Sequence, residues 1–119
     1  YVVFRYADVL LMKAEALLRT GNTAGALAIV NQIRTARGAT PLASLTADNL
    51  LDERGRELYW EGHRRTDLIR YGLLTTGTYL WPWKGGVASG TAVDSKYNLF
   101  PIPAANRTSN PNLEQNPGY

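Results

Sequence analysis

The residues of this 119-residue sequence that are best suited to chemistry lie in one charged stretch, from Asp52 to Gly72. The stretch holds five of the ten acidic residues of the chain and five arginines, but no lysine. The acidic residues are Asp52, Glu53, Glu57, Glu61 and Asp67, and the arginines are Arg54, Arg56, Arg64, Arg65 and Arg70. Such residues suit either acid–base catalysis by paired carboxylates or permanent ion pairing.

Acid–base catalysis by paired carboxylates would need two of them on one side of a helix. Glu57 and Glu61 have the i,i+4 spacing for this arrangement. Glycoside hydrolases use two carboxyl groups across the bond that they cleave. Their general acid needs a raised pKa, whereas the arginines three or four positions away lower the pKa values of these glutamates. We therefore expect no catalytic residue in this stretch and no enzyme activity.

The sequence also offers little for metal binding, because it contains one histidine, His63, and no cysteine. Glu61 and His63 are two positions apart, and this spacing does not place two ligands on one helical face. We expect no metal site and no cofactor. We interpret His63 as a turn or hydrogen-bonding residue.

The same charges suit a structural role. On a helical wheel, Arg54 and Glu61 fall within a face of leucines, Glu57 borders that face, and Glu53 lies outside it. Buried charges persist only when they are paired, and arginine binds a carboxylate through two parallel bonds. We predict a partly buried ion network that joins the third and fourth helices to the preceding hairpin. Its members are Arg54, Glu57, Glu61, Arg64, Asp67 and Arg70.

Four predicted helices, at about residues 5–20, 23–37, 47–61 and 64–71, position these charges. Asn22 or Thr23 can cap the second helix, Gly38 can end it, and Thr46 can cap the third. The short turn near residue 21 makes the first two helices an antiparallel hairpin. The sequence therefore predicts an all-α fold.

The hairpin has small residues at Ala16, Gly21 and Ala26, which is the spacing of a tetratricopeptide-like unit. An unrelated helical hairpin is the alternative interpretation. The first helix has one narrow, mostly polar stripe, formed by Asp8, Met12, Glu15 and Arg19. The rest of this helix is largely apolar, so we expect other elements to cover it.

Residues 72–119 differ in composition, because Gly, Thr, Ser, Asn, Pro and aromatic residues dominate without a sustained period. We predict a long, irregular, loop-rich tail that packs on the helices. Tyr79, Trp81 and Trp83 form an aromatic cluster in it. Exposed aromatic residues can stack on sugar rings or anchor a partner, so these three are candidate ligand-binding residues. The alternative is that they attach the loop to the helices.

Composition sets few further limits. The net charge of +3 and the pI near 9.4 indicate only a mild excess of basic residues, and acidic residues nearby balance most of the arginines. We therefore expect no nucleic-acid partner. No apolar run approaches the roughly 20 residues that span a bilayer. No signal peptide is visible, and the chain opens with a helical pattern and no methionine. We interpret the chain as a piece of a longer protein.

Six groups of short motifs follow in order along the chain. They are Arg5-Tyr6-Ala7-Asp8 with Ala14-Glu15-Ala16, Asn31-x-x-Arg34, Glu53-Arg54-x-x-Glu57-Leu58, Glu61-Gly62-x-Arg64-x-x-Asp67-Leu68-Ile69-Arg70, Pro101-Ile102-Pro103, and Asn110-Pro111 followed by Gln115-Asn116-Pro117-Gly118-Tyr119. By these motifs the whole chain resembles the C-terminal part of the SusD/RagB-like family. The motifs look structural in that family, and most known ligand contacts come from a part that this chain lacks. The resemblance therefore assigns no ligand-binding residue.

The resemblance implies a surface-exposed outer-membrane lipoprotein that binds glycans or other nutrients without catalysis. Such a protein delivers its ligand to a SusC-like TonB-dependent transporter, and a lipid rather than a transmembrane helix anchors it. The implied fold is α-helical, with tetratricopeptide-like hairpins. Two other functions stay open at this point: a helical-repeat scaffold that binds a peptide or protein partner, and a glycoside hydrolase.

Overall fold

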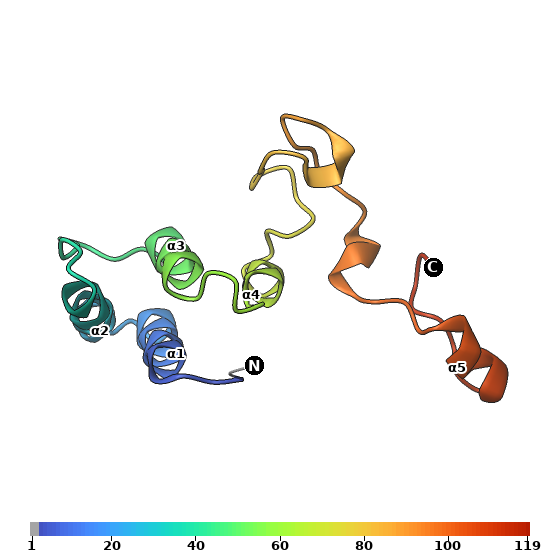
Figure 1. The fold of residues 1–119 in the computed structure, drawn as a ribbon, viewed down its shortest axis with the longest axis horizontal. Coiled ribbons are helices and arrows are strands. Elements are labelled where there is room, and N and C mark those ends of the chain that lie inside the picture. Colours follow the sequence, from blue (N-terminus) through green and yellow to red (C-terminus); the bar gives the residue numbers. More distant parts are fainter. Residues whose placement is uncertain (1–2) are drawn as a thin grey trace. The chain divides into compact units, whose positions relative to one another are not determined.

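A computed structural model describes residues 3–119, which divide into two compact units that meet in sequence between Arg64 and Arg65. Within residues 3–119 the ordered elements are helices and no strand occurs, so the predicted all-α fold is confirmed (Figure 1). No helix in this range is both long enough and apolar enough to span a bilayer.

The first unit begins with the helices α1 (Tyr6–Arg19) and α2 (Thr23–Ala36), which form the expected antiparallel, tetratricopeptide-like hairpin (Figure 1). Gly21 has a φ of +87°, a left-handed conformation that glycine adopts without steric cost. The amide of Asn22 donates to the carbonyl of Leu17 at 2.8 Å, which satisfies the end of α1. The side chain of Asn22 accepts a hydrogen bond from the amide of Gly25 at 2.9 Å, so the prediction of a cap at this turn is confirmed.

The hydrophobic core of the first unit lies where α1 meets α2 and α3 (Ala47–Glu57). Its buried members are Leu11, Ala14, Ala26, Val30, Ile33, Leu45, Leu50 and Leu58. One detail of the predicted packing is wrong: Ala16 is exposed, and Ala14 is the small residue of α1 that is fully buried. Ala26 is buried as expected.

The predicted polar stripe of α1 is divided between the inside and the surface. Its acidic members Asp8 and Glu15 are buried, whereas its other members Met12 and Arg19 are exposed, as are the apolar residues Tyr6 and Val9. The helix therefore turns its acidic side chains toward the inside of the first unit. Buried carboxylates need partners, and arginines supply them.

The helix α3 begins where the sequence predicts, because the hydroxyl of Thr46 accepts a hydrogen bond from the amide of Asn49 at 3.1 Å. It ends at Glu57, four residues before the predicted end at Glu61. The carbonyl of Glu57, which would accept the amide of Glu61 in a longer helix, accepts the guanidinium of Arg5 instead. The amide of Glu61 donates to the carbonyl of Leu58 at 3.1 Å and so closes a turn.

Residues 37–46, which connect α2 to α3, are held by the side chain of Asn31. Its amide nitrogen donates to the carbonyl of Leu42 at 2.9 Å, and its oxygen accepts from the amide of Leu42 at 2.7 Å. Gly38, with a φ of +71°, follows the end of α2 as predicted. These two residues fix the path by which α3 reaches the core.

The second unit contains most of α4 (Arg64–Arg70) and the tail. The tail is less irregular than predicted, because it includes two 3-10 helices, η1 (Lys84–Gly86) and η2 (Ser95–Asn98), and the helix α5 (Ala104–Ser109). Within this unit, Arg65 of α4 donates to the carbonyl of Tyr97 at 2.5 Å and lies over the ring of Phe100, 4.2 Å from its centroid. Packing of the tail on the earlier helices stays a prediction.

Candidate functional site

Three charged side chains of α3, those of Glu53, Arg54 and Glu57, contact the hairpin rather than open solvent. Arg54 lies 3.0 Å from the carboxylate of Asp8, and each of the two side chains is only 3% exposed. Arg54 is therefore a buried cation whose counter-charge comes from another helix. Breaking such a pair leaves one charge in a poorly solvated place.

Glu57 receives two arginines from different parts of the hairpin. Arg5 approaches its carboxylate at 2.7 Å from the residue before α1, and Arg37 approaches at 2.7 Å from the end of α2. The hydrogen bonds from Arg37 and then from Arg5 hold the pKa of the Glu57 carboxyl below its usual value. Arg5 also donates to Glu61 at 2.8 Å, and that bond lowers the pKa of Glu61.

Glu53 is buried, although the helical wheel places it outside the leucine face. Arg34 of α2 donates to its carboxylate at 2.7 Å, and Arg56 does so at 2.8 Å from the next turn of the same helix. The wheel compares only positions on one helix, so it cannot show that α2 brings an arginine to Glu53.

The predicted network residues are thus distributed among several partners. The structure pairs Asp67 with Arg70 at 2.9 Å within α4, whereas Arg64 donates to the carbonyl of Leu51 at 2.9 Å. The main partners of Arg54, Glu57 and Glu61 lie outside the predicted set. They are Asp8, Arg5 and Arg37, of which only Arg5 and Asp8 stand within a motif that the sequence analysis singled out. These charges hold elements together, and the low pKa values of Glu57 and Glu61 do not suit a general acid.

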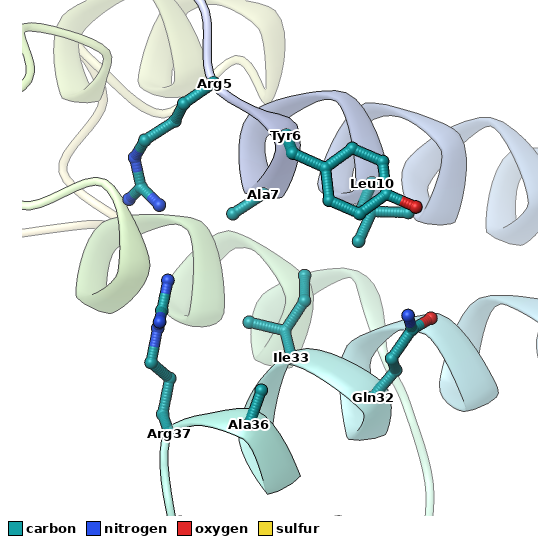
Figure 2. A pocket seen from close by; sticks show the side chains of 8 residues that line it. All are labelled: Arg5, Tyr6, Ala7, Leu10, Gln32, Ile33, Ala36 and Arg37. Atoms are coloured by element: carbon teal, nitrogen blue, oxygen red, sulfur yellow. The ribbon is translucent and has the colours of Figure 1, made fainter.

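A groove of about 390 Å³ lies between the start of α1 and the end of α2 (Figure 2). Figure 2 shows Leu10 and Ile33 facing each other across it, with Arg5 and Arg37 pointing toward each other near one end. Both guanidinium groups already contact Glu57. The groove therefore offers apolar surface, whereas its two arginines, Arg5 and Arg37, already form ion pairs that hold the helices together.

The candidate aromatic residues lie in the second unit. The rings of Tyr79 and Trp81 are 6.4 Å apart and tilted by 57°. Trp81 is 37% exposed, and Trp83 is 70% exposed with a left-handed φ of +68°. The structure thus places Tyr79 beside Trp81 and leaves the surface of Trp83 largely open.

Lys84 organises this loop, and sequence reasoning missed it. The residue is buried, and its ammonium group donates to the carbonyls of Thr76 at 2.5 Å, Tyr79 at 2.7 Å and Leu73 at 3.4 Å. It also lies 4.7 Å from the centre of the Trp81 ring, close enough for a cation–π contact. Burial lowers the pKa of the Lys84 side chain. One lysine between a tryptophan and two glycines gives no sequence signal for such a role.

An open pocket of about 530 Å³ adjoins this loop. Its wall includes the aromatic side chains Trp81 and Tyr97 and the charged side chains Arg65, Lys84 and Asp94. Aromatic surface combined with a few polar groups is typical of ligand-binding pockets. Among residues 3–119, no group of three or more histidine, aspartate or glutamate side chains is placed to hold a metal ion.

Comparison with known proteins identifies related sequences and structures. A sequence profile described as the SusD family matches residues 1–119. Starch-binding protein SusD of Bacteroides thetaiotaomicron is 44% identical over 118 residues, which are 98% of this chain and 21% of that protein. The SusD-like protein P38 of Formosa agariphila is 35% identical over 99% of this chain and 24% of its own length. The chain therefore spans less than a quarter of these curated relatives.

The fold also matches solved structures. Surface glycan-binding protein A from Bacteroides uniformis superimposes with a TM-score of 0.80 at 32% identity, over 95% of this chain and 26% of that one. Surface glycan-binding protein A from Bacteroides thetaiotaomicron gives a TM-score of 0.78 at 29% identity, over 97% of this chain and 24% of that one. The helical arrangement described above thus recurs in proteins that are named for binding.

Proposed function

This chain belongs to the SusD family, and on that premise we propose that it is part of a non-catalytic protein that binds glycans or other nutrients at the bacterial cell surface. The names of its relatives, which state binding of starch or of surface glycans, support this proposal. The low pKa values of Glu57 and Glu61 support binding rather than hydrolysis.

Within this chain, the proposal rests on one observation. The side chain of Trp81 is partly exposed and lines the open pocket of the second unit. A sugar has one face of C–H groups, which packs on an aromatic ring, and hydroxyls that bind polar side chains. The same pocket supplies both kinds of group. We propose Trp81 as the main sugar contact, with Tyr79 and Trp83 as neighbouring contacts.

The wider setting is also a proposal. We infer that the longer protein is a lipid-anchored, surface-exposed lipoprotein of the outer membrane, and that it delivers its ligand to a SusC-like TonB-dependent transporter. Membership of the SusD family supports this placement. Affinity purification of the longer protein from solubilised outer membranes tests it. Identification of a TonB-dependent transporter in stoichiometric amount is the expected result, and recovery without any transporter would contradict the inference.

The binding proposal is tested by titrating the longer protein that contains this chain against a panel of neutral and charged oligosaccharides, with calorimetry as the readout. We expect measurable binding of at least one glycan and its loss in Trp81→Ala, because removal of a stacking ring costs about 1–3 kcal/mol in comparable contacts. Trp60→Ala is the matched control, since Trp60 is 89% exposed and lies in the first unit. A longer protein that binds no member of the panel would refute glycan binding, and one that binds equally well without Trp81 would refute the assignment of Trp81.

A further inference from the structure

The pocket beside Trp81 has an unbalanced positive charge. Two cations, Arg65 and Lys84, and one anion, Asp94, line it. The second unit as a whole shows the same bias, with five basic and three acidic residues from position 65 onward. We propose that this pocket binds a carboxylate-bearing sugar, such as a uronic acid, with Arg65 as the residue that holds the carboxylate. The inference rests on the proposed function and narrows its ligand class.

Arg65 differs from the arginines of the ion network. Arg5, Arg34 and Arg54 each pair with a carboxylate of the protein. Arg65 has no carboxylate partner within the part of the chain that the structure describes, and its contacts are the carbonyl of Tyr97 at 2.5 Å and the ring of Phe100. A guanidinium has five N–H donors, and the bond to the Tyr97 carbonyl uses one of them.

The contacts of Arg65 also preorganise it. The carbonyl bond and the aromatic ring fix the plane of the guanidinium, which limits the conformational entropy that is lost when a ligand binds. A planar guanidinium can then bind a carboxylate through two parallel hydrogen bonds, which are about twice as strong as bonds between neutral groups. Arg65 is therefore already held in place for an incoming anion.

Lys84 contributes charge rather than hydrogen bonds. Its three N–H donors have three carbonyl acceptors, so they are already satisfied. Its ammonium group is buried, and the loss of solvation lowers the pKa of the group. An anionic ligand in the adjoining pocket would stabilise this charge.

Asp94 offsets only one of the two cations of the pocket. One oxygen of its carboxylate accepts a hydrogen bond from the amide of Lys96 at 2.8 Å and caps η2. It lines the same pocket as Arg65 and Trp81, where a carboxylate suits recognition of a sugar hydroxyl. The ring of Trp81 then provides the surface for the C–H face of the same sugar.

The test uses two probes with one backbone: an oligosaccharide of glucuronic acid units, and the same oligosaccharide with its carboxyl groups reduced to alcohols. We expect the longer protein to bind the acidic form about tenfold more tightly, or more, because a charged hydrogen bond contributes more than about 1.4 kcal/mol. The preference should weaken as salt concentration rises.

The Arg65→Gln variant should lose most of the preference, because only the charge of Lys84 then favours the acidic probe. Arg65→Lys, which keeps the charge but not the two parallel bonds, should retain a smaller preference. Arg107→Gln is the matched control, because Arg107 is an exposed arginine of the same unit on α5. The near-ultraviolet circular dichroism of each variant shows whether the aromatic loop is intact.

The outcomes are distinguishable. Equal binding of the two probes by the unaltered chain would overturn this inference and leave glycan binding standing. An undiminished preference in a folded Arg65→Gln variant would overturn the role of Arg65. Loss of all binding, to these probes and to the neutral panel, would overturn the proposed function together with this inference.

Discussion

Arg54 of α3 and Asp8 of α1 form an ion pair of 3.0 Å, and each side chain is only 3% exposed. The pair joins two helices that meet in the core of the first unit. Removing one member leaves the other as a buried, unpaired charge. The pair is therefore expected to affect stability far more than an exposed ion pair does.

We predict that Arg54→Ala lowers the free energy of unfolding by about 3–5 kcal/mol, measured by urea denaturation. Asp52→Ala is the matched control, because Asp52 is 51% exposed and lies 4.0 Å from the partly exposed Arg64. Its expected loss is below about 1 kcal/mol. Replacement of both Arg54 and Asp8 by apolar residues should recover part of the loss. A loss below about 1 kcal/mol in Arg54→Ala would show that the pair is not a buried joint.

Acid should weaken the ion pairs of Glu57 with Arg5 and Arg37. Its pKa is lowered in the folded chain, so its contribution to stability is complete above the pKa of the unfolded chain, near 4.5. That contribution is lost as the pH falls below 4.5 through the lower value of the folded state. In thermal melts from pH 7 to pH 3, Glu57→Gln should lose less stability than the unaltered chain. Glu114→Gln, which changes an exposed carboxylate, should follow the unaltered chain. If the plots of melting temperature against pH are parallel for the unaltered chain and both variants, the prediction is contradicted.

The connection between α2 and α3 should depend on one side chain. Asn31→Ala removes both hydrogen bonds to Leu42, and the two backbone groups then need new partners. We expect a loss of about 1–3 kcal/mol in urea denaturation. Gln32→Ala, at the exposed neighbouring position, should change stability by less than about 0.5 kcal/mol. Similar losses in the two variants would indicate that Asn31 does not fix the connection.

A methyl group at Gly90 should displace Trp81. Gly90 has a φ of +80°, and an added Cβ would lie 2.6 Å from the backbone carbonyl oxygen of Trp81. Gly86 has a similar φ of +77° and open space around it, so Gly86→Ala carries only the backbone cost of about 1–2 kcal/mol.

The readout for these two variants is the indole N–H signal of Trp81 in a heteronuclear NMR spectrum, assigned with Trp81→Phe. We expect it to shift strongly in Gly90→Ala and little in Gly86→Ala. Glycan binding should weaken in the first variant alone. Equal shifts in both would mean that backbone strain, rather than the close approach to Trp81, controls the loop.

Local sequence signals predict the helices of this chain well. The caps at Asn22 and Thr46 and the glycine at Gly38 act through atoms a few residues away, and the structure confirms each of them. The end of α3 could not be found in this way. The carbonyl of Glu57 is taken by Arg5, which lies 52 positions earlier in the chain.

The sequence did not reveal the partners of the charged residues, and it revealed their burial only in part. The wheel shows that Arg54 faces the core, but the identity of its partner depends on how α1 crosses α3. Because the helical wheel does not show how helices cross, Asp8 and Glu15 were expected in a polar stripe, whereas they are buried. The role of Lys84 depends on three carbonyls that a folded loop brings together, and no residue pattern encodes them.

The contact between Arg5 and Glu57 also has a kinetic consequence. Most contacts of the α1–α2 hairpin join residues close in sequence, whereas this contact closes a segment of 52 residues. Closing a longer segment loses more chain entropy, so we expect the hairpin to form first and this contact late in folding. Interactions that form after the transition state control mainly the rate of unfolding. Arg5 should therefore set how long the first unit stays folded rather than how fast it folds.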